Sequence, residues 1–266
     1  MHRYYYCEGT RIMTGTEAAK QSLVSIVAFI LDRHPDLSEV IKRLAIKAYP
    51  SIYRNSEAKR FNPLGARLID LIGKKNGYFI ELGANNGVTQ SNTFLLERDH
   101  GWTGVLIEPV LHNFLACVQY RSSQTKKFCC ACVSTTYQKD YVELVYSNLM
   151  TTPINLESDV SDALAHALEG QAFVDHPADT RFLAPARTLD SILQEADAPH
   201  QIDLLSLDVE GAELEVLKGI NYESVIFNKI CVESRDPERL EKFLSGFGYR
   251  LSAKLTHLDY MFEYCN

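Results

Sequence analysis

Two spacings of apolar residues alternate along most of the chain, and they predict which segments are strands and which are helices. Short runs of branched and aromatic residues are typical of strands, and apolar residues three or four positions apart are typical of helices. We predict the main strands, in chain order, at residues 78–82, 103–107, 127–133, 202–207, 229–233, 249–255 and 258–264. We predict the main helices at residues 64–72, 91–100, 110–121, 212–217 and 237–245.

This alternation of strands and helices predicts the fold class. A strand that is followed by a helix and then by another strand usually forms a parallel pair, with the helix crossing one face of the sheet. The last two strands are separated by only a few residues, which favours an antiparallel hairpin. We therefore expect an α/β fold with a doubly wound, mostly parallel sheet and an antiparallel hairpin at its carboxyl-terminal end.

Two segments do not follow the alternating pattern. Residues 16–48 carry apolar residues near helical spacing, interrupted at Pro35, and predict an N-terminal helical extension over residues 1–60 that acts as a lid or an oligomer contact. The main domain is expected over residues 61–266. Within it, residues 135–186 are less regular, with a short strand at 141–146 and a helix at 158–168, and are interpreted as an insert.

Composition and charge exclude several classes of protein. The 266 residues are 46% hydrophobic and carry a net charge of −7, so a broad basic surface for nucleic acid is not expected. The longest apolar stretch, residues 23–31, is too short to span a membrane. The seven cysteines are odd in number and irregularly spaced, which does not favour a disulfide framework and indicates a reducing, cytoplasmic compartment.

The first predicted strand leads into an acid and a glycine loop. Glu81 ends this strand, and Gly83 and Gly87 follow in the sequence E-L-G-A-N-N-G. Glycines let the backbone turn sharply and approach a ligand closely. The spacing is not the G-x-G-x-x-G of dinucleotide enzymes. Because an acid precedes the glycines, the loop favours a cationic ligand such as S-adenosylmethionine over a pyrophosphate.

Acids also follow two other predicted strands. Glu108 comes after the second strand, and Asp208 comes after the strand at 202–207. In a doubly wound sheet, these positions lie along the crevice at the carboxyl ends of the strands. The two carboxylate oxygens of Glu108 suit a ribose diol, since they can accept two hydroxyl protons.

Four segments, in this order, resemble the FkbM family of S-adenosylmethionine-dependent methyltransferases. They are F-I-E-L-G-A-N-N-G-V-T-Q-S-N at 79–92, G-W-T-G-V-L-I-E-P at 101–109, T-L-D-S-I-L at 188–193 and I-D-L-L-S-L-D-V-E-G-A-E-L-E-V-L-K-G at 202–219. The resemblance covers about residues 64–264. It implies a class I, Rossmann-like methyltransferase fold and O-methylation, most often of a sugar or natural-product hydroxyl.

The resemblance also implies roles for individual residues. It places Asp208 near the point of methyl transfer. The other implied cofactor-binding residues are Glu81 and Gly83 at the methionine end, Ala84, Asn85 and Gly87 in the loop, Glu108 at the ribose and Ser134 at the adenine.

The start of the helix predicted at 91–100 is a further candidate. Ser91 and Asn92 could receive the cofactor carboxylate with their side chains and free backbone N–H groups. They could also simply cap the helix, and the two roles are compatible.

Candidate bases lie near the acceptor end of the predicted crevice. Asp208 or Glu210 could take the proton of an acceptor hydroxyl, or could hold Mg²⁺ against a substrate diol. Glu210 could instead cap the following helix. Two histidines of the insert, His166 and His176, are further candidate bases.

The expected function is S-adenosylmethionine-dependent O-methylation of a sugar or glycan, with nucleotide sugars among the acceptors. One alternative acceptor is a polyketide or another small natural product. A second alternative is a non-catalytic binding module that keeps the cofactor fold. No nucleic-acid partner and no membrane span are expected, and the N-terminal extension is compatible with a homo-oligomer.

Overall fold

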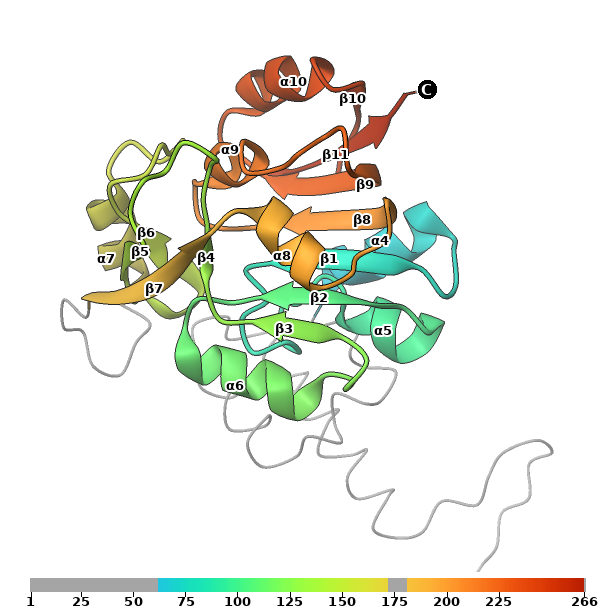
Figure 1. Ribbon diagram of the computed structural model, residues 1–266, viewed down its shortest axis with the longest axis horizontal. Helices are drawn as coiled ribbons and strands as arrows, with labels where there is room; N and C mark the ends of the chain where they lie inside the picture. Colours follow the sequence, from blue (N-terminus) through green and yellow to red (C-terminus); the bar gives the residue numbers. More distant parts are fainter. Residues whose placement is uncertain (1–61, 172–180, 266) are drawn as a thin grey trace, which may run out of the picture. The chain divides into compact units, whose positions relative to one another are not determined.

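The computed structural model describes residues 62–171 and 181–265 (Figure 1). The predicted extension over residues 1–60 and the candidate base His176 lie outside the described residues. No helix within the described ranges is long and apolar enough to cross a membrane.

The main sheet of the described chain has seven strands. All neighbouring pairs are parallel except those made by β11, which runs antiparallel to both β9 and β10. The predicted doubly wound sheet with an antiparallel terminal hairpin is therefore confirmed. The strands lie in the spatial order β10 (Tyr249–Lys254), β11 (Asp259–Tyr264), β9 (Ile226–Glu233), β8 (Gln201–Leu207), β1 (Tyr78–Leu82), β2 (Thr103–Ile107) and β3 (Lys126–Phe128).

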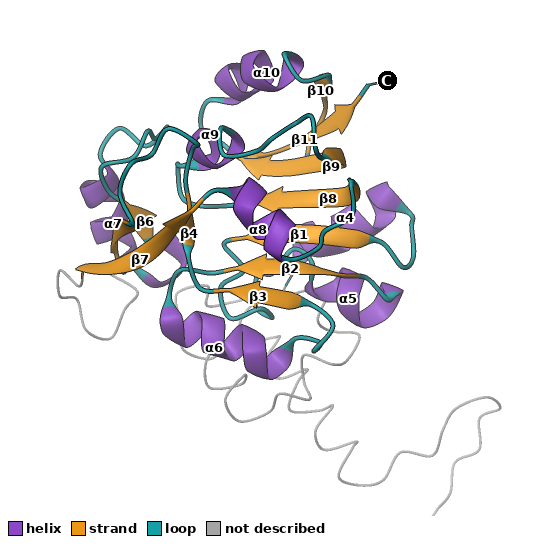
Figure 2. Cartoon of the chain, viewed as in Figure 1, coloured by secondary structure: helices purple, strands orange, loops and turns teal. Residues whose placement is uncertain are grey.

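Helices cover both faces of this sheet (Figure 2). Along β1, Phe79 packs toward one helical layer and Ile80 toward the other, because successive side chains of a strand point to opposite faces. This is why the strands are apolar at consecutive positions instead of alternating. One layer is formed by α4 (Pro63–Ile72), α5 (Phe94–His100) and α6 (Leu111–Tyr120), and the other by α8 (Leu189–Glu195), α9 (Glu213–Leu217) and α10 (Pro237–Ser245).

The order of the strands opens a crevice between β1 and β8. From β1 the chain proceeds to β2 and β3 on one side, whereas β8 and β9 extend the sheet on the other side. The loops after β1 and β8 therefore turn away from each other at the carboxyl edge. Ligands of open α/β sheets bind at such a switch point.

A second, smaller sheet lies beside this edge of the main sheet. It corrects the prediction of one strand at 127–133, because the chain bends after β3 and its continuation pairs elsewhere. Strand β7 was not predicted, and it contains Pro185, a residue that is uncommon within sheets. The second sheet contains β4 (Ala131–Cys132), β7 (Arg181–Arg187), β5 (Tyr141–Val145) and β6 (Thr152–Pro153), accompanied by the short helix η3 (Asn148–Met150) and by α7 (Ala163–Gln171).

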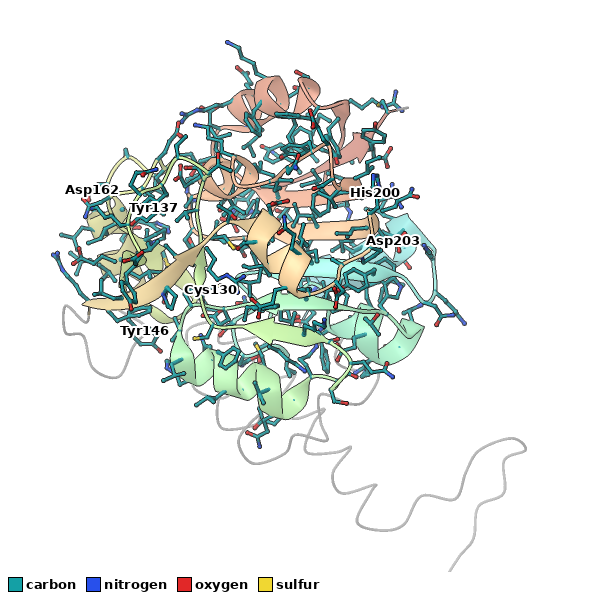
Figure 3. The ribbon with its side chains drawn as sticks, in the orientation of Figure 1. Cys130, Tyr137, Tyr146, Asp162, His200 and Asp203 are labelled. Atoms are coloured by element: carbon teal, nitrogen blue, oxygen red, sulfur yellow. The ribbon has the colours of Figure 1, made fainter. Side chains whose placement is uncertain are left out.

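At the end of the main sheet opposite the crevice, one carboxylate links three strands. Asp203 accepts hydrogen bonds from the backbone N–H of Tyr78 at 2.9 Å, from Lys74 Nζ at 2.6 Å and from Asn228 Nδ2 at 3.1 Å. Figure 3 shows Asp203 and His200 at the end of the sheet opposite Cys130. This acid holds β1, β8 and β9 in register and lies far from the crevice.

A buried ion pair ties the glycine loop to β1 and α6. The Glu81 carboxylate accepts hydrogen bonds from Ser91 Oγ at 2.8 Å, from the backbone N–H of Asn92 at 2.6 Å and from Thr93 Oγ1 at 2.6 Å. Arg121, just past α6, lies 3.6 Å from the same carboxylate, and both side chains are almost completely buried.

Arg121 makes further contacts with the loop and with α5. Its guanidinium donates to the carbonyl of Gly87 at 3.0 Å and to the carboxylate of Glu97 at 3.1 Å. The residues predicted to open the first helix are thus bound to Glu81 instead, which is why α5 begins at Phe94 and not at Ser91.

We predict that Arg121→Met strongly destabilises the protein. The change leaves the buried carboxylates of Glu81 and Glu97 without their cation, which typically costs about 3–5 kcal/mol. Urea unfolding measures this loss. Lys126→Met is the control, because it removes an exposed ion pair with Asp197, which is worth about 1 kcal/mol or less. Equal losses in the two variants would contradict the assigned role of Arg121.

Candidate functional site

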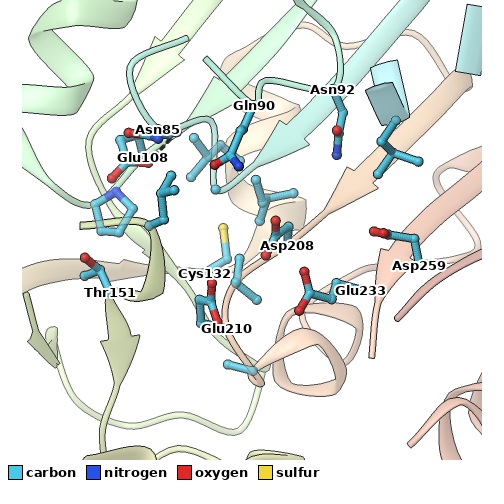
Figure 4. A pocket seen from close by; sticks show the side chains of 18 of the residues that line it. Asn85, Gln90, Asn92, Glu108, Cys132, Thr151, Asp208, Glu210, Glu233 and Asp259 are labelled. Carbon is cyan, nitrogen blue, oxygen red and sulfur yellow. Dashed lines mark hydrogen bonds between the residues drawn. The ribbon is translucent and has the colours of Figure 1, made fainter. Parts of the chain in front are cut away.

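A cavity of about 640 Å³ lies at the carboxyl ends of β1, β2 and β8 (Figure 4). Its floor is formed by the loops after these strands, and part of its wall comes from the second sheet and the segment after it, through Leu144, Thr151 and Leu156. The volume falls within the range that is usual for small-molecule sites.

Gly83 brings the ends of β1 and β8 into direct contact. Its φ is +75°, and a Cβ at this position would lie 1.8 Å from the carbonyl oxygen of Asp208. Only glycine fits here, because both the backbone conformation and the space exclude a side chain. The close approach places Asp208 beside the glycine loop, and both residues line the cavity.

Glu108 lies at the β2 side of the cavity, as its position after that strand predicts. Its carboxylate accepts the backbone N–H of Asn85 at 2.8 Å and that of Val110 at 2.9 Å. Only 5% of the residue is exposed, and burial raises the pKa of the carboxyl to about 7. Asn85, with φ of +49°, also lines the cavity.

Several predicted cofactor residues do not line the cavity. Glu81 and Ser91 are bonded to each other and to Arg121, so their polar atoms are used to hold the loop. The Ser134 hydroxyl donates to Glu215 at 2.7 Å. These three side chains make contacts within the protein, and their direct contact with the cofactor stays a prediction.

Of the other predicted residues in this region, Ala84 and Gly87 do not line the cavity, whereas Asn92 does. Ala84 packs into the core, and Gly87 has φ of +76° and lies against Arg121 and Cys117. Asn92 does line the cavity, and its side chain donates to Ser206 Oγ at 3.0 Å. Asn92 therefore remains a candidate for ligand contact.

Carboxylates gather at the end of the cavity away from Glu108. Asp208, Glu210, Glu233 and Asp259 all line this end and are seen together in Figure 4. Sequence reasoning named the first two. Asp259 was missed, because it lies beside Glu233 only through the antiparallel register of β11 and β9.

Two of these carboxyls, Asp208 and Glu233, have raised pKa values. Burial is the main cause of the pKa of Asp208 lying well above its usual range, and the charges of Glu233 and Glu210 raise it further. Burial raises the pKa of Glu233 to about 7, with added repulsion from Glu210 and Asp259. This end of the cavity therefore binds protons readily when no cation or hydroxyl occupies it.

A metal role for Asp208 and Glu210 gains no support from the arrangement. Within residues 62–171 and 181–265, no group of three or more His, Cys, Asp or Glu side chains could hold a metal ion. The Mg²⁺ role stays a prediction.

Comparison with known proteins places the chain in a family. The sequence model of the methyltransferase FkbM domain matches residues 81–251, more than half of the chain. The chain belongs to the FkbM methyltransferase family. S-adenosylmethionine is the cofactor of this family, and the glycine loop and Glu108 of this FkbM domain face a cavity that suits it. The class I fold implied by the resemblance agrees with the observed order of the strands.

Several solved structures show a weak likeness to this FkbM domain. TrmK from M. capricolum in complex with S-adenosyl-homocysteine has 8% identity and a TM-score of 0.38, with 74% of this chain and 66% of TrmK covered. A ribosomal protein L11 methylase from Lactobacillus delbrueckii subsp. bulgaricus has 11% identity, a TM-score of 0.32, and coverage of 76% and 77%. A SAM-dependent methyltransferase from Aquifex aeolicus has 10% identity, a TM-score of 0.32, and coverage of 78% and 90%. Likenesses this weak carry no argument about the substrate. No curated protein matches the sequence.

The buried carboxylates predict that the ligand-free FkbM domain loses stability as the pH rises. Glu213 is buried, accepts the backbone N–H groups of Val209 and Gly211, and has a pKa raised from 4.5 to about 8. Between these two values the folded state binds more protons than the unfolded state, so the free energy of unfolding falls as pH increases. Glu108 and Glu233, with pKa values of about 7, act in the same direction.

Urea unfolding between pH 5 and pH 8.5 tests this. Glu213→Gln keeps an oxygen for the two N–H groups and should flatten the decline in unfolding free energy. Glu238→Gln, an exposed change on α10, should leave it unaltered. An unchanged slope in Glu213→Gln would show that Glu213 does not contribute.

Proposed function

We propose that this protein transfers the methyl group of S-adenosylmethionine to a hydroxyl of a sugar or glycan, with nucleotide sugars among the acceptors. The observation that carries the proposal is the set of four carboxylates at one end of the cavity, Asp208, Glu210, Glu233 and Asp259. Carboxylate oxygens accept hydrogen bonds from hydroxyls, and a carbohydrate presents several hydroxyls together. An apolar polyketide would offer few hydrogen-bond donors to the carboxylate oxygens that face the cavity, which is costly in a buried site.

The opposite end of the cavity is suited to the cofactor. Each carboxylate oxygen of Glu108 accepts one backbone N–H and keeps a second lone pair for a ribose hydroxyl, and Gly83 lets the backbone approach the ligand. Asn85 lies beside Glu108, and Asn92 also lines the cavity. When bound, the cofactor supplies an electrophilic methyl group on a positively charged sulfur.

Asp208 is the residue best placed to act as the base. It lies between the cofactor end and the acceptor end, next to Gly83. A carboxylate with a raised pKa is a stronger proton acceptor, so Asp208 takes the hydroxyl proton and leaves the acceptor oxygen as the nucleophile. A positive charge beside Asp208 favours its ionised form, which matches the base to a cationic cofactor. The cavity walls also accelerate methyl transfer, because they hold the acceptor oxygen, the methyl carbon and the sulfur in line.

A methyl-transfer assay with a panel of acceptors tests the proposal. Formation of S-adenosylhomocysteine is followed with nucleotide sugars, glycans and apolar aromatic alcohols. Turnover with the sugars is expected. Turnover only with apolar acceptors would overturn the carbohydrate assignment, and cofactor binding without any turnover would favour a non-catalytic module.

Glu108→Ala is expected to weaken S-adenosylmethionine binding. The ribose hydroxyls lose a charged acceptor, and such hydrogen bonds are worth about 1.5–3 kcal/mol, or roughly 10–100-fold in affinity. Calorimetric titration measures this. Glu238→Ala serves as the control, and thermal unfolding confirms that Glu108→Ala is folded. If both variants bind as tightly as the wild type, Glu108 is not a ribose ligand.

Asp208→Asn is expected to slow turnover much more than it weakens cofactor binding. The amide cannot take a proton, and loss of a general base costs about 10²–10⁴-fold in kcat. The dissociation constant for S-adenosylmethionine should change only a few-fold. Parallel losses of turnover and affinity would instead make Asp208 a cofactor or folding residue.

A further inference from the structure

Glu210 has an unusual backbone conformation at the acceptor end of the cavity. It lies two residues after Asp208, lines the cavity, and has a φ of +57°. This left-handed region is unfavourable for a residue with a long side chain, and it persists only where the surroundings hold it. Such an outlier beside a ligand cavity suggests that the direction of the Glu210 side chain matters for function.

The backbone around Glu210 is held from two sides. Glu213 accepts the N–H groups of Val209 at 3.0 Å and Gly211 at 3.1 Å. On the other side, the carbonyl of Gly211 accepts the N–H of Asp159 at 3.0 Å, and a Cβ at Gly211 would lie 2.5 Å from Ser158 Oγ. The segment just before α7 therefore packs closely against this turn.

The side chain of Glu210 is held by the insert as well. His166, on α7, places Nε2 2.7 Å from Glu210 Oε2, and the two side chains are 12% and 14% exposed. Arg235 Nη2 lies 3.8 Å from the same oxygen. Among the described residues, both contacts of this carboxylate are to Oε2, so Oε1 is left to accept a hydrogen bond in the cavity.

His166 contacts Glu210 from outside the cavity. Glu210 lines the cavity, whereas His166 does not, and Nε2 of His166 is engaged by Glu210. This arrangement favours a role of His166 behind Glu210 over a role as the base. The insert contributes to the site twice, because it supplies Thr151 of the cavity wall and α7, which carries His166.

We infer that His166 is a positioning residue that fixes Glu210, so that Glu210 Oε1 binds a hydroxyl of the acceptor. The inference rests on the proposed function, since it takes the carboxylate end of the cavity as the acceptor site. It assigns the insert a part in acceptor binding and no part in cofactor binding.

The kinetic test compares His166→Ala, His166→Gln and the control His200→Ala, which lies at the opposite end of the sheet (Figure 3). His166→Ala should raise the acceptor KM about 10-fold or more, because a charge-assisted hydrogen bond that orients Glu210 is lost. The dissociation constant for S-adenosylmethionine should stay within about two-fold. His166→Gln, which keeps an N–H donor, should restore most of the acceptor KM, and His200→Ala should resemble the wild type.

Combination with Glu210→Ala separates positioning from a general structural effect. If His166 works through Glu210, His166→Ala adds no further rise in KM in the Glu210→Ala background. An unchanged KM in His166→Ala, or an equal rise in both backgrounds, would overturn the inference.

A measurement that needs no acceptor shows whether the His166–Glu210 pair or the proposed function has failed. In thermal unfolding, the double variant should lower Tm no more than the larger of the two single changes, since both break the same contact. Additive Tm losses would reject the His166–Glu210 pair while leaving O-methylation intact. Non-additive losses in a protein that methylates none of the acceptors would reject the proposed function and, with it, the acceptor role of the pair.

Discussion

The site depends on one buried ion pair, between Glu81 at the end of β1 and Arg121 after α6. Removing two charges from water is unfavourable unless each finds a full set of partners. The partners come from separate segments, since Ser91 and Thr93 bind the carboxylate and Gly87 and Glu97 bind the guanidinium. The pair is satisfied only when the glycine loop, α5 and α6 are all in place, so it fixes the loop that forms one wall of the cavity.

The close contact at Gly83 then decides what the loop faces. Because Gly83 has no side chain, the end of β8 packs directly against the end of β1, and this contact places Asp208 at the crevice. The crevice therefore has a β2 side with Glu108 and a β9 side with several acids. A cofactor at the first side and an acceptor at the second would meet beside Asp208.

The carboxylates at the β9 side of the cavity repel one another. The raised pKa values of Asp208 and Glu233 reflect burial first and then the charges of neighbouring carboxylates, which a hydroxyl-rich ligand or a nearby cation would relieve. Two basic side chains approach the same oxygen of Glu210, His166 from the insert and Arg235 from the segment after β9 of the main sheet. Under the proposed function, the insert and the main sheet together would position Glu210 for the acceptor.

The main sheet and the acids at its edge could be predicted from the order of residues along the chain. The apolar runs of β1 and β2 were bounded correctly, because buried parallel strands are apolar on both faces and stop at polar or glycine residues. The position of Glu108 and Asp208 at strand ends followed from the same periodicity. These features are local, so the order of residues is sufficient to predict them.

Which acids line the cavity could not be predicted in this way, because it depends on the packing of segments that are distant in the chain. Glu81 and Glu108 both end apolar strands, yet Arg121 turns one into a structural residue, and this arginine is distant in sequence. Asp259 lies at the site because of the antiparallel register between β11 and β9. His166 lies beside Glu210 because of how the insert packs, and the insert has little periodicity in its sequence. Such contacts depend on how distant segments pack, which no spacing along the chain records.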